Sequence, residues 1–240
     1  MHALKEIQIE LKSKANLEKA QILQRFFKTG KGEYAEGDIF YGVTVPETRS
    51  TAKKFSEKIS LLEAEKLLHS KIHEERLCAL LLLIQKFENK KTTQKEKKEI
   101  FDFYLKNTKY INNWDLVDLS SHEIVGAYLY AHPEEEKILE KLSNSTLLWD
   151  KRIAMVSCHH FIYRKEYSEA LKVAQTLLKD EHDLIHKAVG WMLREIGKRD
   201  LKTEKAFLKK HYKNMPRTML RYAIEKFPEK ERKTYLEGKV

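Results

Sequence analysis

The residues best suited to chemistry in this sequence are tryptophans that stand beside charged side chains. Trp114 precedes Asp118 by four residues, Trp149 precedes Arg152 by three, and Trp191 precedes Arg194 by three. Residues at these spacings lie on one face of a helix, so each ring should share a surface with its charged neighbour. Such a surface could attract a cation or an anion. For any one tryptophan, burial in the core is the more common outcome.

The elements that must position these residues are predicted to be helices throughout the chain. Apolar residues recur at helical spacing, and alternating strand-like runs are nearly absent. The sequence from Ser60 to Glu63 predicts a capping box at a helix start. Pro46, Pro133 and Pro216 are placed where new helices should begin, since proline suits a first turn. The predicted fold class is therefore all-α.

Several of the predicted helices resemble one another at a steady interval. Arg76, Arg152, Lys187 and Arg221 each open an apolar segment, and the last two steps are 35 and 34 residues. The first step of 76 residues is two steps of 38. These intervals are typical of helix-pair repeats of the HEAT or armadillo kind, which stack into a curved α-solenoid. The recurrent cations are predicted to line its concave face.

Composition is consistent with one continuous domain over residues 1–240 that binds a polyanion. The net charge is +10, and residues 187–240 carry 16 Lys and Arg against 7 Asp and Glu. Such an excess favours nucleic acid, although a solvated lysine-rich surface would also produce it. Neither a signal peptide nor a membrane span is expected, and two cysteines cannot form a disulfide framework. We therefore expect a cytoplasmic protein.

Four segments in consistent order resemble the DNA alkylation repair family, the AlkD-type DNA glycosylases built from HEAT-like repeats. They are GVTVPETR at 42–49, NWDLVD at 113–118, WDKRIA at 149–154 and KAVGWMLRE at 187–195. The resemblance covers about residues 40–200, and the two ends of the chain match no segment that we can map. It implies a concave basic face that binds double-stranded DNA. It also implies action at the sugar and backbone without a deep base pocket.

Carried over position by position, the resemblance assigns four catalytic residues. It implies that Asp118 is the catalytic carboxylate, that Trp114 and Trp191 are paired aromatic walls, and that Arg152 is the active-site arginine. These residue types also suit the chemistry by themselves. A carboxylate can stabilise an oxocarbenium-like sugar and position water, and ring faces attract a cationic purine. Asp115 lies elsewhere on the helix surface and is predicted to be a structural partner.

Further cations are predicted to bind DNA phosphates, and no cofactor is expected. Cys158, His159 and His160 are adjacent and diverge on a helix, so a metal site is not predicted. His160 lies eight residues after Arg152 and could meet a phosphate, or it could be an ordinary surface histidine. The predicted enzyme is a monomeric, monofunctional hydrolase that removes N3- or N7-alkylated purines in base excision repair. The predicted DNA-binding residues are Arg49, His160, Lys187, Arg194 and Lys198.

Two other interpretations of the sequence remain open. The first is a helical-repeat protein that binds nucleic acid without catalysis, and the second is a HEAT scaffold for other proteins with its tryptophans in the core. A carboxylate beside two tryptophans favours catalysis, because a pure binder gains nothing from a negative charge facing phosphates.

The charge pattern leads to a prediction about ionic strength. The cations expected to neutralise phosphates are Arg49, Arg152, Lys187, Arg194 and Lys198, so the affinity for duplex DNA should fall steeply with salt. The slope of log affinity against log salt should be reduced by roughly 0.9 for each contact that is removed by mutation. Fluorescence anisotropy of a labelled duplex over a range of salt concentrations measures this slope. Binding that is insensitive to salt would contradict phosphate contacts along the chain.

Overall fold

The chain is all-helical in this computed structural model, which describes residues 2–240. Within the described residues the only extended pairing is an isolated parallel bridge between Ile39 and Ile72. The all-α prediction is confirmed. Contacts between Cα atoms divide the chain into two compact units, residues 1–120 and 121–240. None of the described helices has the length and apolar character needed to cross a bilayer.

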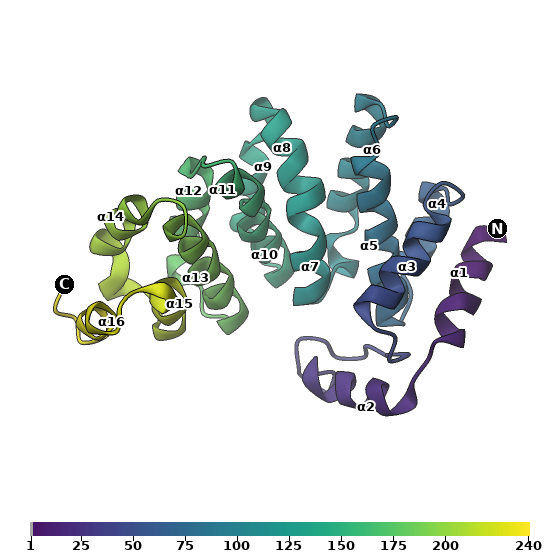
Figure 1. Cartoon of the computed structure of the whole chain (residues 1–240), viewed down its shortest axis with the longest axis horizontal. Helices are drawn as coiled ribbons and strands as arrows, with labels where there is room; N and C mark the ends of the chain where they lie inside the picture. The colour runs from purple at the N-terminus through teal and green to yellow at the C-terminus, as the bar shows by residue number, and fades with distance from the viewer. Residues whose placement is uncertain (1) are drawn as a thin grey trace. The chain divides into compact units, whose positions relative to one another are not determined.

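The first unit is organised around one long, almost entirely buried helix, α5. Its middle residues, 77–84, are all buried, and α3, α4 and α6 pack against it. A helix that is apolar on every side must be surrounded in this way. The helices of this unit are α1 (His2–Ser13), α2 (Leu17–Phe26), α3 (Val45–Phe55), α4 (Leu61–Leu68), α5 (His73–Glu88), α6 (Gln94–Lys106) and α7 (Trp114–Ser121), whose last residue belongs to the second unit (Figure 1).

The second unit begins with a π-helical turn at His122–Gly126 and continues in short helices. Its helix α13 packs against α10, α14 and α15, so three of the similar segments found in the sequence are helices packed in chain order. This is the stacking of helix pairs expected of an α-solenoid. The helices are α8 (Ala127–Ala131), α9 (Lys137–Ser143), α10 (Leu148–Ser157), α11 (His159–Tyr163), α12 (Ser168–Thr176), α13 (Asp183–Gly197), α14 (Leu201–His211), α15 (Arg217–Ala223) and α16 (Glu229–Leu236).

The predicted helix starts are confirmed. Ser60 and Glu63 form the capping box of α4, with the serine side chain accepting from the Glu63 amide. Pro46 lies in the first turn of α3, Pro133 begins a short 3₁₀ turn, and Pro216 is the N-cap of α15. Capping residues and prolines in the sequence therefore predicted these helix starts correctly.

Both cysteines are buried. Cys78 lies within α5, and Cys158 follows α10, where its thiol donates to the Ala154 carbonyl. Burial raises the pKa of the Cys78 thiol to about 12 and raises that of Cys158 as well. Each thiol is therefore protonated at neutral pH.

The segment between α2 and α3 crosses the start of α5 and is held there by backbone bonds. The Ile39 amide donates to Lys71 and the Ile39 carbonyl accepts from His73. The Glu74 carboxylate accepts from the amides of Tyr41, Gly42 and Val43. Gly42 has a positive φ of 81°, in the region where residues with a Cβ are strained.

Gly42→Ala should destabilise the protein strongly. A Cβ at Gly42 would overlap the Asn16 carbonyl oxygen and the Ala20 amide nitrogen, in addition to the strain of the positive φ. We expect a loss of more than about 2 kcal/mol of unfolding free energy, the upper end of the cost of left-handed backbone alone. Urea denaturation measures it. Gly238→Ala is the matched control, since Gly238 has a φ of 73° and open space around it. Equal losses in the two variants would show that the close approach at Gly42 does not matter.

Candidate active site

Trp114 lies at one end of a continuous stack of rings in the first unit. Its ring is stacked on Phe27, with 5.1 Å between centroids, and Phe27 is stacked on Phe40 at 5.2 Å. Phe40 is in turn stacked on the imidazole of His73 at 4.5 Å. The indole N–H of Trp114 donates to the Tyr34 hydroxyl at 3.2 Å. Trp114 is half-buried in this stack, so part of its surface is still accessible to solvent.

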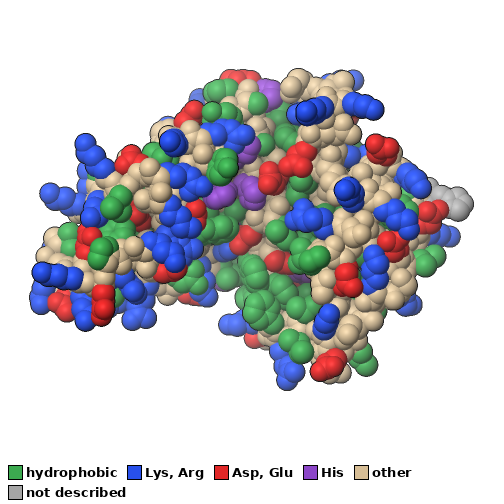
Figure 2. Space-filling view, in the orientation of Figure 1, with side chains coloured by type: hydrophobic (Ala, Val, Ile, Leu, Met, Phe, Trp, Pro, Cys, Tyr) green, Lys and Arg blue, Asp and Glu red, His purple; other side chains and the backbone are tan. Residues whose placement is uncertain are grey.

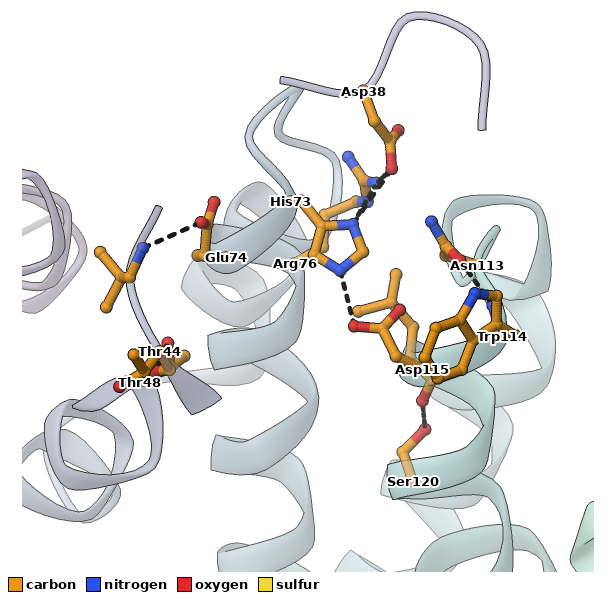
Figure 3. A network of polar contacts seen from close by, with 12 residues as sticks. Asp38, Thr44, Thr48, His73, Glu74, Arg76, Asn113, Trp114, Asp115 and Ser120 are labelled. Atoms are coloured by element: carbon orange, nitrogen blue, oxygen red, sulfur yellow. Dashed lines mark hydrogen bonds and ion pairs between the residues drawn. The ribbon is translucent and has the colours of Figure 1, made fainter. Parts of the chain in front are cut away.

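The stack ends on a buried network of ionisable groups at the start of α5 (Figure 3). His73 lies between two carboxylates: its Nδ1 is 3.1 Å from Asp38 and its Nε2 is 2.8 Å from Asp115. Arg76 donates to the same Asp38 oxygen at 2.5 Å and to the Ser70 carbonyl. All four residues are buried, with at most 8% of the residue surface exposed. The prediction that Asp115 is a structural partner is confirmed, and its partner is His73.

The charges of this network depend on one another. Burial alone would lower the pKa of His73, but Asp115 and Asp38 outweigh it and raise that pKa to about 8. Burial would raise the pKa of Asp38, yet the bond to His73 and the charge of Arg76 hold it below its usual value. At neutral pH the imidazole is therefore mostly protonated and donates to both carboxylates. The prediction that Arg76 lines a DNA-binding face is wrong, because its guanidinium is buried in this network.

Asp118 lies one helical turn after Trp114 on α7. Both residues are half-buried, whereas Asp115, Leu116 and Val117 between them are buried. The spacing of four residues places ring and carboxylate on the same side of α7, as predicted. The bond from His73 to Asp115 anchors the first turn of this helix, so the network fixes the backbone that carries both candidates.

Trp191 and Arg152 belong to the second unit, so the candidate catalytic set is divided between the two units. Trp191 is half-buried on α13, with its ring 6.0 Å from the His159 ring and its indole N–H donating to Glu195. Arg152 on α10 is buried, and its guanidinium donates to the Leu184 carbonyl at 2.5 Å. In the structure Arg152 thus ties α10 to the start of α13.

The predicted DNA-binding cations differ in their surroundings. Arg49 is exposed on α3 and has no ion pair among the described residues. Three others are paired with carboxylates: Lys187 with Asp183 at 2.7 Å, Lys198 with Glu195 at 2.6 Å, and Arg194 with Glu225.

His160 is half-buried, and burial together with the charge of Arg164 lowers its pKa to about 4. It is therefore neutral at pH 7 and could serve a phosphate only as a hydrogen-bond donor.

Lysine and arginine side chains gather over the second unit, where α13–α16 lie (Figure 2). The sequence predicts this excess, since residues 187–240 hold 16 of the 46 basic residues and 7 of the 36 acidic ones. Surface ion pairs of this kind are weak, so phosphates could displace the carboxylates that now pair with some of the cations.

Sequence reasoning missed Asp38 and His73, and it gave Arg76 a different role. The one local signal was the polar run from His73 to Arg76 at the start of α5, directly before its buried apolar residues 77–84; all four polar residues are buried. A charged run that must enter the core requires partners. Those partners lie 35 and 42 residues away from His73 in the sequence.

Comparison with known proteins supports the resemblance seen in the motifs. A family model described as DNA alkylation repair enzyme matches residues 7–227. A solved structure titled a predicted DNA alkylation repair enzyme from Enterococcus faecalis is similar with a TM-score of 0.71 and 18% identity, covering 90% of this chain and 98% of that one. The crystal structure of smu.31 from Streptococcus mutans UA159 is similar with a TM-score of 0.55 and 18% identity, covering 85% and 96%. A search of curated proteins found no match.

The protonated state of His73 predicts how stability changes with pH. The pKa of His73 is raised in the folded protein from 6.5 to about 8, so its contribution is complete below pH 6.5 and is lost as pH rises through 8. The loss should be about 2 kcal/mol. Urea denaturation at pH 6.5 and pH 9 measures it.

His73→Gln is the control for this measurement, because glutamine keeps hydrogen-bonding capacity but does not titrate. Its loss of stability between the two pH values should be about 2 kcal/mol smaller than that of the wild type. Burial raises the pKa of Glu204 to about 8, so Glu204 contributes an equal loss in both proteins. A wild-type protein that is equally stable at both would contradict the protonated network.

Proposed function

We propose that this chain, which belongs to the DNA alkylation repair enzyme family, is a monofunctional DNA glycosylase that removes cationic N3- or N7-alkylated purines from duplex DNA. The reaction is hydrolysis of the N-glycosidic bond, the first step of base excision repair. The observation that carries the proposal is the pairing of Trp114 and Asp118 on one side of α7, both half-buried. A carboxylate beside a partly accessible indole suits a substrate with positive charge on base and sugar.

Hydrolysis of this N-glycosidic bond requires stabilisation of positive charge on the sugar more than it requires acid catalysis. An alkylated purine already carries a positive charge, so it leaves as a neutral base when the glycosidic bond breaks. The deoxyribose is left with oxocarbenium character, which the Asp118 carboxylate stabilises. The same carboxylate orients water for attack on the anomeric carbon, and the water proton passes to the carboxylate or to solvent. The ring of Trp114 holds the cationic nucleotide through its electron-rich face.

The second unit contributes the remaining proposed contacts. Trp191 forms the second aromatic wall, and Arg152 binds the phosphate next to the lesion. To make that contact, the Arg152 guanidinium either binds the phosphate while it still donates to the Leu184 carbonyl, or gives up that hydrogen bond. The phosphates of the duplex backbone are bound by Arg49, Lys187, Arg194, Lys198 and neutral His160.

A non-catalytic protein that binds DNA is the second candidate. The burial of Arg152 favours it, because a guanidinium that is already bonded within the fold is a weaker candidate for a catalytic contact. The two candidates differ in whether Asp118 is needed for turnover.

Asp118→Asn should abolish most base excision while leaving duplex binding intact. Asparagine keeps the shape of the side chain and removes the charge that stabilises the sugar. Loss of such electrostatic stabilisation commonly lowers rates about a hundred- to a thousandfold. The measurement is single-turnover release of N7-methylguanine from a duplex, with affinity measured in parallel. Affinity should be unchanged or higher, since a carboxylate opposes a polyanion.

Asp102→Asn on α6 is the matched control, because Asp102 is an exposed aspartate of the same unit that pairs with Lys98 on the surface. It should excise as the wild type does. Equal excision by wild type and Asp118→Asn would remove Asp118 from the mechanism. No excision by the wild type from any alkylated duplex would favour the non-catalytic candidate.

A further inference from the structure

A cavity of about 240 Å³ lies in the first unit between α2, the start of α3 and the start of α5. Its walls are mainly apolar and include three phenylalanine rings, and it is distinct from the Trp114 and Asp118 surface because neither residue lines it. Phe27 and Phe40 belong to the ring stack described above, and Phe26 contacts Trp114 edge-on at 5.9 Å. The main apolar lining residues are Leu23, Phe26, Phe27, Phe40, Val43 and Leu77.

The mouth of the cavity is unusually apolar for a protein surface. Ile22 and Phe26 on α2 are 51% and 61% exposed, and Val45 at the start of α3 is 38% exposed. All three line the cavity. Hydrophobic side chains gather beside α2 in the space-filling view (Figure 2). Clustered exposed apolar residues around a cavity are characteristic of a ligand-binding site.

One buried carboxylate oxygen at the cavity has no hydrogen-bond partner. Asp115 is 8% exposed and lines the cavity together with His73. Its Oδ2 accepts from His73, whereas its Oδ1 has no partner among the described residues. The other carboxylate in the lining, Glu74, is already occupied by three backbone amides. A buried charged oxygen left unpaired is costly, so Asp115 Oδ1 calls for a donor from outside the fold.

We propose that this cavity binds a planar nitrogen heteroaromatic of the size of a purine base, which donates one N–H to Asp115 Oδ1. The volume is below the range of drug-sized sites, which excludes a whole nucleotide. The aromatic walls match a flat ring, and such rings are commonly held by stacking and by hydrogen bonds at their edges. Asp115 supplies an acceptor oxygen that has no partner among the described residues, and Lys19 supplies a cation in the lining.

The inference rests on the proposed function in one respect: the physiological ligand of the cavity is the alkylated purine that the proposed reaction releases. Asp115 and Asp118 lie three residues apart on α7, so the cavity and the proposed catalytic carboxylate share a helix. The cavity would hold the free base, which has left the DNA, and does not require an extruded nucleotide to enter it.

The test is a titration of the full-length protein with free 3-methyladenine, followed by NMR. The chain has three tryptophans, so its three indole N–H signals report on separate places. Saturable binding should shift the Trp114 signal, because Trp114 contacts two rings of the cavity wall, and should leave Trp149 and Trp191 unchanged. Caffeine, a purine without any N–H donor, should bind about tenfold more weakly or not at all.

Two variants test the cavity, and a third is the control. Phe26→Ala removes a wall and should weaken 3-methyladenine binding about two- to tenfold. Asp115→Asn removes the charged acceptor and should weaken it about tenfold. Leu17→Ala changes another exposed residue of the same helix, 76% exposed and outside the cavity, and should bind as the wild type does. Phe26 is exposed, so its variant remains informative if Asp115→Asn fails to fold.

The outcomes separate the cavity from the glycosylase activity. Absence of 3-methyladenine binding, equal binding of caffeine, or normal binding by Phe26→Ala would overturn the proposal. Excision by a wild type that binds no free base would overturn the cavity and leave the glycosylase standing. Base binding at Trp114 without excision from any alkylated duplex would support the cavity and refute the glycosylase.

Discussion

The buried bond between His73 and Asp115 is the interaction on which the first unit depends. It joins the start of α5 to the start of α7, and through Asp38 and Arg76 it also holds the segment that leads into α3. Two carboxylates, one guanidinium and one protonated imidazole nearly neutralise one another in a place where a single unpaired charge would be very costly. Removing any one member would therefore leave a charge without compensation. The network explains why polar residues form the buried first turn of α5.

The same network also fixes the geometry of the proposed chemistry. His73 is both an ionic partner of Asp115 and the last ring of a stack that runs through Phe40 and Phe27 to Trp114. The start of α7 is thus held by an ion pair on one side and by aromatic packing on the other. A rigid supporting shell of this kind lets a side chain such as Asp118 act with little reorganisation.

The parts of this structure that sequence could predict are those with local causes. Capping at Ser60 and the prolines at 46, 133 and 216 act within one turn, so their helices were predicted correctly. The pairing of His73 with Asp38 and Asp115 joins residues far apart in the chain and has no local signature. A repeat pattern does not show whether a recurrent cation lies on the surface or in the core, because Arg76 occupies a repeated position and is bonded to Asp38 in the buried network. The roles of Trp114, Asp118, Arg152 and Trp191 in catalysis stay predictions.

The burial of Cys78 and Cys158 matters for a protein that meets alkylating conditions. Electrophiles that methylate purine nitrogens also attack thiols, and they do so through the thiolate, which is far more nucleophilic than the protonated form. Both cysteines are shielded from solvent, and both have raised pKa values, so very little thiolate is present at neutral pH. Burial and protonation thus both disfavour alkylation of the two thiols.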